Sequence, residues 1–173
     1  MKLTSFTDYS LRVLIYLAAR PEQRATVAEI AQAYDIKQNH LTKVVHFLGR
    51  QGWLTTVRGK GGGLQLAVAA QDIGIDAVVR AAEGADLPAE CFDPAANTCP
   101  IARVCRLKRV LREATEAFHA ALAQYTLAYL ALFGAAVAVA LGARLNDGYV
   151  LLVVPPWRAE ISLNLLILAL LAL

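Results

Sequence analysis

The feature that most constrains the fold is a basic, glycine-rich run at residues 58–63, which lies between two short apolar segments. Residues 53–57 are rich in β-branched and aromatic side chains, and large apolar residues alternate with smaller or polar ones over residues 64–68. Both patterns are typical of strands. Glycine permits the positive φ angles of a tight turn, and Arg58 and Lys60 give the tip positive charge. The sequence therefore predicts a two-stranded hairpin with a basic tip. A nucleotide-phosphate loop is a weaker alternative, because the run lacks the Gly-Lys-Ser/Thr ending.

Three helices are predicted before this hairpin. Apolar residues recur at helical spacing over residues 7–20. Thr26 and Glu29 form a regular capping box for a second helix, and Asp35 and Gln38 repeat that pattern before a third. The expected buried stripe of the third helix consists of Leu41, Val44, Val45 and Leu48.

The third helix has a polar outer face. Its side chains can hydrogen-bond base edges and phosphates in a major groove. A helix-turn-helix followed by a basic hairpin defines a winged helix, so we expect a DNA-binding domain, with a plain solvated helix as the alternative. The candidate DNA-binding residues are Asn39, His40, Thr42, Lys43, His46, Arg50, Arg58 and Lys60.

Positive charge is concentrated at the front of the chain. Residues 1–66 contain nine Lys and Arg against four Asp and Glu, whereas the remainder contains eight against ten. A basic surface suits phosphate, although a merely solvated basic face is an equal alternative on charge alone. Residues 1–10 are polar and lack the apolar run of a signal peptide, so we expect a cytoplasmic protein.

Three cysteines, Cys91, Cys99 and Cys105, fall within one short segment. Their number is odd and the expected compartment is reducing, which argues against a disulfide framework. Thiolates are the preferred ligands of iron–sulfur clusters, and a four-iron cluster needs four ligands. The fourth ligand must therefore be another residue or come from another chain. Zinc bound by the three cysteines and an acid or histidine is the alternative.

A long helix is predicted after Pro100, to about Tyr129. Val104, Leu111, Phe118 and Tyr125 recur every seven residues, flanked by further apolar positions. A heptad stripe usually packs against another helix, so we expect a dimerisation helix. A dimer also suits a palindromic DNA site, whereas burial of the stripe against its own domain is the alternative.

Three segments together resemble the NsrR group of winged-helix regulators, whose family also includes the iron–sulfur regulator IscR. They are the opening at residues 1–12, the hairpin tip at residues 57–63 and the run Cys105-Arg106-Leu107-Lys108. The resemblance extends from residue 1 to about residue 130. It implies a homodimer with an iron–sulfur cluster in each subunit, which represses genes for nitric oxide detoxification.

The resemblance also implies a fourth ligand. Some members of the family use a histidine three residues after the last cysteine, but Lys108 stands there in this chain and cannot ligate. The NsrR group instead implies Asp8, reaching over from the partner subunit. An oxygen ligand is hard and poorly matched to iron–sulfur chemistry, which would make this corner labile. Without the resemblance, Asp8 is best interpreted as a first-turn acid stabilised by the helix dipole.

The C-terminal tail departs from this resemblance. Residues 127–143 carry no charge over a length at the lower limit for a membrane span, and residues 161–173 are again apolar. Tyr149 to Val154 is predicted to be a strand that Pro155 ends. Residues 148–152 and 158–162 are similar to the membrane-anchoring start of HemY-type proteins. The tail is thus either a membrane tether or the product of two joined genes, and a buried soluble helix is the less favoured alternative.

The sequence therefore predicts a mainly α protein: a winged helix with a two-stranded wing, a long dimerisation helix and an apolar tail. The expected domains are residues 1–84 for DNA binding, 85–130 for the cluster and dimerisation, and 131–173 for the tail. The expected function is repression, with nitric oxide sensed at a 4Fe-4S rather than a 2Fe-2S cluster and a palindromic operator released on nitrosylation. Alternatives are a cluster-free regulator that senses through thiols or zinc, and a redox protein tethered to the inner membrane through residues 127–173. No paired carboxylates or nucleophile–base pair indicate an enzyme.

Overall fold

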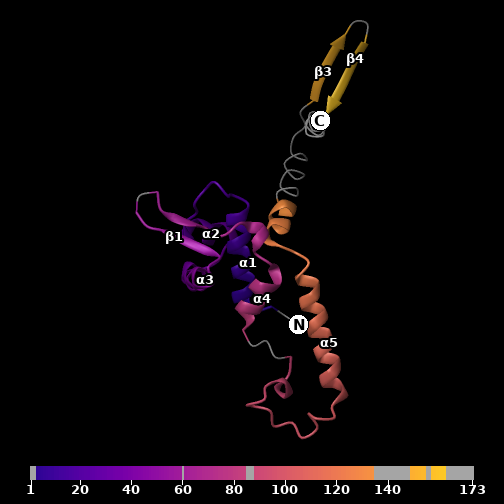
Figure 1. The fold of residues 1–173 in the computed structure, drawn as a ribbon. Helices are drawn as coiled ribbons and strands as arrows, with labels where there is room; N and C mark the ends of the chain where they lie inside the picture. The colour runs from indigo at the N-terminus through magenta and orange to yellow at the C-terminus, as the bar shows by residue number, and fades with distance from the viewer. Residues whose placement is uncertain (1–2, 60, 85–87, 135–148, 155–156, 163–173) are drawn as a thin grey trace. The chain divides into compact units, whose positions relative to one another are not determined.

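The computed structural model describes residues 3–59, 61–84, 88–134, 149–154 and 157–162. The chain divides into two compact units, residues 1–132 and 133–173. The first unit contains the predicted winged helix and the long helix (Figure 1).

Three helices open the first unit: α1 (Ser5–Ala18), α2 (Val27–Tyr34) and α3 (Gln38–Arg50). The predicted capping box of α2 is confirmed, with Thr26 and Glu29 each hydrogen-bonded to the other's backbone. The box predicted for α3 is wrong. Asp35 instead adopts a left-handed conformation (φ 52°) at the end of α2, and Lys37 precedes α3 without a side-chain cap.

The predicted wing is present. Strand β1 (Leu54–Val57) pairs antiparallel with β2 (Gly63–Leu66), in a register that places Leu54 opposite Leu66 and Val57 opposite Gly63. Both strands are shorter than predicted, because Trp53 and Val68 lie outside them. Trp53 instead packs edge-on against Phe47 of α3, with ring centroids 6.5 Å apart.

The apolar core joins these elements to α4 (Ile75–Glu83), which follows the short helical turn η1 (Ala70–Asp72). Removing these side chains from water is the main stabilisation of the fold. The fully buried residues come from α1, α2, α3, α4 and the segments between them, together with Leu127 much further along the chain. The largest are Leu14, Leu17, Ile30, Leu41, Leu48, Ile73 and Leu127.

The long helix is shorter than predicted. Helix α5 spans Arg106–Leu122, and residues 127–134 form a separate helical segment. The interruption has a backbone cause: Ile75 N donates to Tyr125 O, and Leu127 N donates to Ile73 O. These groups pair with the start of α4 instead of continuing the helix.

The predicted heptad residues and the apolar residues beside them consequently divide between two environments. Phe118 and Leu122 pack against the core of their own unit. Val104, Leu107 and Val110, at and before the start of α5, are exposed by 81 %, 61 % and 53 %. The burial alternative therefore holds for the C-terminal half of α5, whereas the N-terminal half presents an uncovered apolar face.

In the second unit, β3 (Tyr149–Val154) pairs antiparallel with β4 (Trp157–Ser162). The strand prediction for residues 149–154 is confirmed, whereas its partner strand was not predicted. No helix among the described ranges is long and apolar enough to cross a membrane. Residues 135–148 and 163–173, which hold most of the apolar tail, lie outside the described residues.

Candidate DNA-binding surface and cysteine segment

The outer face of α3 carries the predicted DNA-binding side chains. Asn39, His40, Thr42, Lys43, His46 and Arg50 are all exposed. The opposite face buries Leu41, Val44 and Leu48, which fixes the rotation of the helix and turns the polar face outward. The Thr42 hydroxyl donates to Gln38 O at 2.9 Å, so it is already engaged with the helix backbone.

The wing contributes a second basic element. Arg58 is exposed beside the hairpin turn, and Lys60 lies outside the described residues. Arg24, from the loop between α1 and α2, contacts the wing through two hydrogen bonds. Arg24 could not be predicted from the sequence, because its partners lie about forty residues further along the chain.

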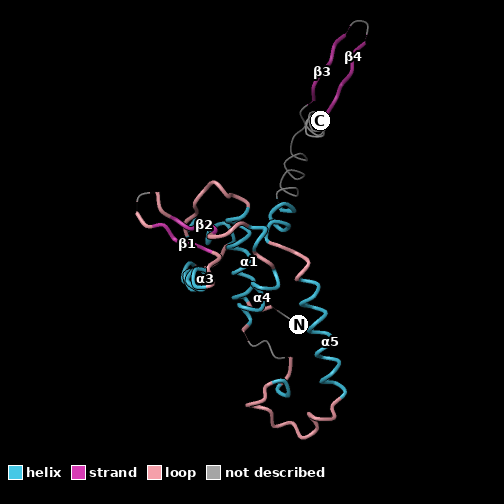
Figure 2. The backbone as a smooth tube through the Cα atoms, viewed as in Figure 1, coloured by secondary structure: helices cyan, strands magenta, loops and turns pink. Residues whose placement is uncertain are grey.

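The three cysteines lie in the segment between α4 and α5, which is mostly loop over residues 88–105 (Figure 2). Cys91 lies in the short helical turn η2 (Glu90–Phe92), Cys99 lies in the loop, and Cys105 is the N-cap of α5. All three are free thiols and half-buried.

Hydrogen bonds across the segment bring the neighbours of two cysteines together. One carboxylate oxygen of Glu90 accepts bonds of 2.6 Å from both the backbone N and the hydroxyl of Thr98. The side-chain and backbone bonds from Thr98 lower the pKa of Glu90. Glu90 precedes Cys91 and Thr98 precedes Cys99, so this clasp closes the loop between them.

A further contact joins this loop to α5. The Lys108 ammonium lies over the Phe92 ring, 5.5 Å from its centroid. A cation over an aromatic face is attractive. Lys108 therefore ties the turn that holds Cys91 to the first turn of the helix that Cys105 caps.

The donor chemistry of this segment suits an iron–sulfur cluster, because it offers three thiols from one short stretch of chain. The described part of the chain nevertheless contains no group of three or more His, Cys, Asp or Glu side chains placed to hold a metal ion. The three cysteines are therefore not gathered into one metal site in this part of the chain.

Asp8 lies in the first turn of α1, and its carboxylate pairs with Arg12 at 2.9 Å. This is the arrangement expected of a first-turn acid. Both side chains are partly exposed, so the pair is weak and can open. A ligand role for Asp8 requires that opening.

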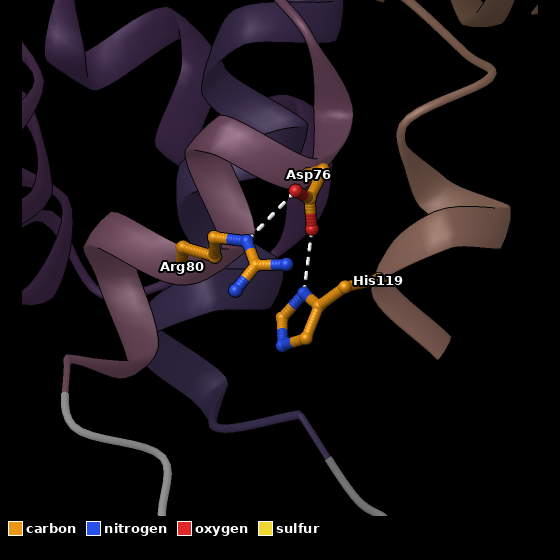
Figure 3. A network of polar contacts seen from close by, with 3 residues as sticks. All are labelled: Asp76, Arg80 and His119. Atoms are coloured by element: carbon orange, nitrogen blue, oxygen red, sulfur yellow. Dashed lines mark hydrogen bonds and ion pairs between the residues drawn. The ribbon is translucent and has the colours of Figure 1, made fainter. Parts of the chain in front are cut away.

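A contact that was not predicted from the sequence joins α5 to α4. His119 of α5 is buried, and its Nδ1 lies 2.5 Å from an Asp76 carboxylate oxygen of α4 (Figure 3). The other carboxylate oxygen accepts from Arg80 Nε at 2.8 Å. Burial raises the pKa of Asp76, but the bonds and charges of Arg80 and His119 outweigh it and hold the pKa below its ordinary value. The only sequence signal was the position of His119 next to Phe118 in the apolar stripe.

A second contact joins α4 to the start of α1. Glu83, the last residue of α4, accepts hydrogen bonds from the backbone N and hydroxyl of Thr4 and from the hydroxyl of Thr7. Burial raises the pKa of Glu83, but these bonds outweigh it and lower the pKa overall. The turn that carries Asp8 is therefore bonded to the end of the helix that leads into the cysteine segment.

Together, the exposed α3 face and the basic wing define a winged-helix, DNA-binding transcription regulator. A family model described as "Iron-dependent Transcriptional regulator" matches residues 3–132, and the chain belongs to this family, Rrf2. The family consists of regulators, which agrees with the expectation of a non-enzyme and gives no support to the redox-protein alternative.

Individual relatives agree with this assignment. The chain is 51 % identical over 128 residues to the HTH-type transcriptional regulator NsrR of Bacillus subtilis, covering 73 % of this chain and 88 % of that protein. Over the same length it is 48 % identical to the NsrR of Halalkalibacterium halodurans. Staphylococcus aureus CymR in its oxidized form is similar in structure, with a TM-score of 0.60 and 29 % identity over 76 % of this chain and 96 % of CymR. T. potens IscR shares the fold, with a TM-score of 0.61 at 20 % identity over 79 % of this chain and 88 % of that one. The family match ends at residue 132, so the likeness of the tail to HemY-type proteins gains no support.

Proposed function

We propose that this regulator is a repressor that binds a palindromic operator as a homodimer and releases it when nitric oxide reacts at an iron–sulfur cluster. The observation that carries the proposal is the 44–51 % identity to five regulators named NsrR. All three cysteines and Asp8 lie inside the family match at residues 3–132.

In this proposal α3 enters the major groove. Asn39 and Lys43 face base edges and phosphates, while the wing places Arg58 and Lys60 against the backbone. The two α3 helices of a dimer enter successive major grooves about 34 Å apart. The exposure of the polar α3 face supports this arrangement.

Cys91, Cys99 and Cys105 would hold the cluster together with Asp8 of the partner subunit, and a 4Fe-4S cluster matches a set of four ligands. When bound, such a cluster supplies iron sites at which a small diatomic molecule can react. Two contacts fix the helices on either side of the cysteine segment. Glu83 bonds to the start of α1 before the segment, and His119 bonds to Asp76 after it. We expect a change in the shape of the segment to move α4 relative to α5, and to reach α1 through Glu83.

The test begins with protein purified without oxygen. We expect a coloured protein that contains iron and sulfide, and that binds an operator duplex selected by the wild-type protein from a random library. Cys99→Ser should remain folded by circular dichroism yet be colourless and weak in operator binding. Colourless, iron-poor wild-type protein that binds the operator at full strength would contradict the sensing part of the proposal.

A cluster-free regulator is the second candidate. It is favoured by three free, half-buried thiols that are not arranged around a metal in the described residues. In the same preparation it predicts either stoichiometric zinc or operator affinity that changes on thiol oxidation, without iron.

The same proposal includes three domains, at residues 1–84, 85–130 and 131–173. It also includes a cytoplasmic location for the protein. The tail either tethers the regulator to the inner membrane or results from joined genes. Cell fractionation with an antibody against the DNA-binding domain distinguishes them: a tethered chain sediments with membranes at full length.

A further inference from the structure

Strand β2 of the wing also pairs with a third backbone segment, at Ala25 just before α2. Ala25 N donates to Leu64 O at 3.1 Å, and Leu64 N donates to Ala25 O at 2.7 Å. A two-stranded hairpin alone is only marginally stable in water. The hairpin formed by β1 and β2 therefore depends on the segment that contains Arg24 and Ala25.

Gly63 makes this close approach possible, and its neighbour Gly62 allows the turn of the hairpin to close. A Cβ at Gly63 would lie 3.0 Å from the Arg24 Cβ and 3.1 Å from Ala25 O, and the φ angle there is +154°. A Cβ at Gly62 would lie 2.4 Å from Val57 O, across the turn. The glycine-rich run thus serves two purposes, because it forms the tip and lets the segment before α2 pack against it.

The Arg24 side chain extends the same contact toward the tip. Its Nε donates to Gln65 Oε1 of β2 at 2.9 Å, and its Nη1 donates to Gly61 O at 3.1 Å. One planar guanidinium therefore joins the tip to the outgoing strand, which an ammonium group cannot do with the same fixed geometry.

We propose that Arg24 is a positioning residue for DNA binding: it fixes the wing tip so that Arg58 meets the DNA backbone. The proposal depends on DNA binding by the family but not on the cysteines or on any signal. Its failure is therefore separate from a failure of the sensing mechanism.

The test compares Arg24→Ala, Arg24→Lys and Arg20→Ala for binding to the selected operator duplex at several salt concentrations. Arg20 is a neighbouring exposed cation whose guanidinium lies over the Tyr16 ring, 4.1 Å from its centroid, so it provides a charge-matched control. Loss of the two wing contacts should weaken binding about three- to tenfold in both Arg24 variants, with less than about twofold loss for Arg20→Ala. Equal affinity of Arg24→Lys and wild type would overturn the proposal, because charge alone would then suffice.

Amide hydrogen exchange provides a readout that does not involve DNA. In Arg24→Ala and Arg24→Lys, amides of residues 61–66 should exchange faster than in wild type, whereas the buried α3 amides should be unchanged. Gln65→Leu, which removes the acceptor for Nε, should reproduce part of both effects. Unaltered exchange at residues 61–66 in both Arg24 variants would overturn the proposal.

Discussion

The contact between Asp76 and His119 fixes how the long helix α5 packs against α4. Their contact joins α4 of the DNA-binding domain to α5, and Arg80 completes it from the same face of α4 (Figure 3). A buried polar group that loses its partner is costly, so the pair fixes the position of α5 firmly. Sequence spacing predicted the apolar neighbours of His119 but not its partner, because Asp76 is 43 residues away.

The lowered pKa of Asp76 predicts a pH dependence of stability. A carboxyl group whose pKa is lower in the folded than in the unfolded protein stabilises the fold above its unfolded pKa, and this stabilisation is lost as the pH falls through the folded pKa. The difference in free energy of unfolding between wild type and Asp76→Asn should therefore be largest above about pH 4 and shrink below it. Urea unfolding from pH 3 to 7 measures it, and a constant difference would contradict the assignment.

The exposed cations of α3 and the wing predict a salt signature. Lys43→Ala and Arg58→Ala should each weaken operator binding by about tenfold and reduce the slope of log affinity against log salt by about one. Arg109→Ala on α5 removes the same charge from a residue that is 76 % exposed and paired with Glu113, and should leave the slope unchanged. Fluorescence anisotropy at four salt concentrations separates these outcomes. An unchanged slope in both variants would remove these residues from the interface.

Among the helices and strands, the features that could be predicted are those that depend on residues close together in the sequence. The capping box of α2, the stripe of α3 and the hairpin β1–β2 follow from residues close together in the chain. The end of α5 could not be predicted this way, because Ile73 and Ile75 draw the backbone near Tyr125 into a non-local pairing. The clasp between Glu90 and Thr98 was missed for a related reason, since it depends on how the loop folds back.

The clasp predicts the reactivity of the cysteines it holds. Glu90→Ala and Thr98→Val should both speed maleimide labelling of Cys91 and Cys99 in cofactor-free protein, because the loop between them opens more often. Cys105, the N-cap of α5, should label at the wild-type rate. Mass spectrometry of labelled peptides measures all three, and equal acceleration at Cys105 would indicate general unfolding instead.

At the scale of the whole molecule, the winged-helix class was predictable from order alone: three helices, a basic hairpin and a later long helix (Figure 1). The surface through which two copies of the chain would meet could not be predicted from this order. Phe118, from the stripe predicted for dimerisation, packs on the core of its own unit together with Leu122. This leaves Val104, Leu107 and Val110 as the apolar face available to a second copy.

Oligomeric state tests that face. Val110→Glu places a charge on the exposed apolar face of the N-terminal half of α5. It should shift the protein from dimer to monomer in analytical ultracentrifugation. Operator binding should weaken with it, because two half-sites are no longer bound together. Ala120→Glu, an exposed position on the other half of the same helix, provides the control. A Val110→Glu dimer of undiminished stability would place the interface elsewhere.

The most direct test of the central claim is one titration of oxygen-free dimer on fluorescent operator DNA with nitric oxide, in which visible absorbance and anisotropy are recorded in the same cuvette. The account predicts that operator binding falls as the visible absorbance changes, and that Cys99→Ser, which lacks the absorbance, does not respond. Absorbance that collapses while the anisotropy of the wild-type complex stays constant would contradict it.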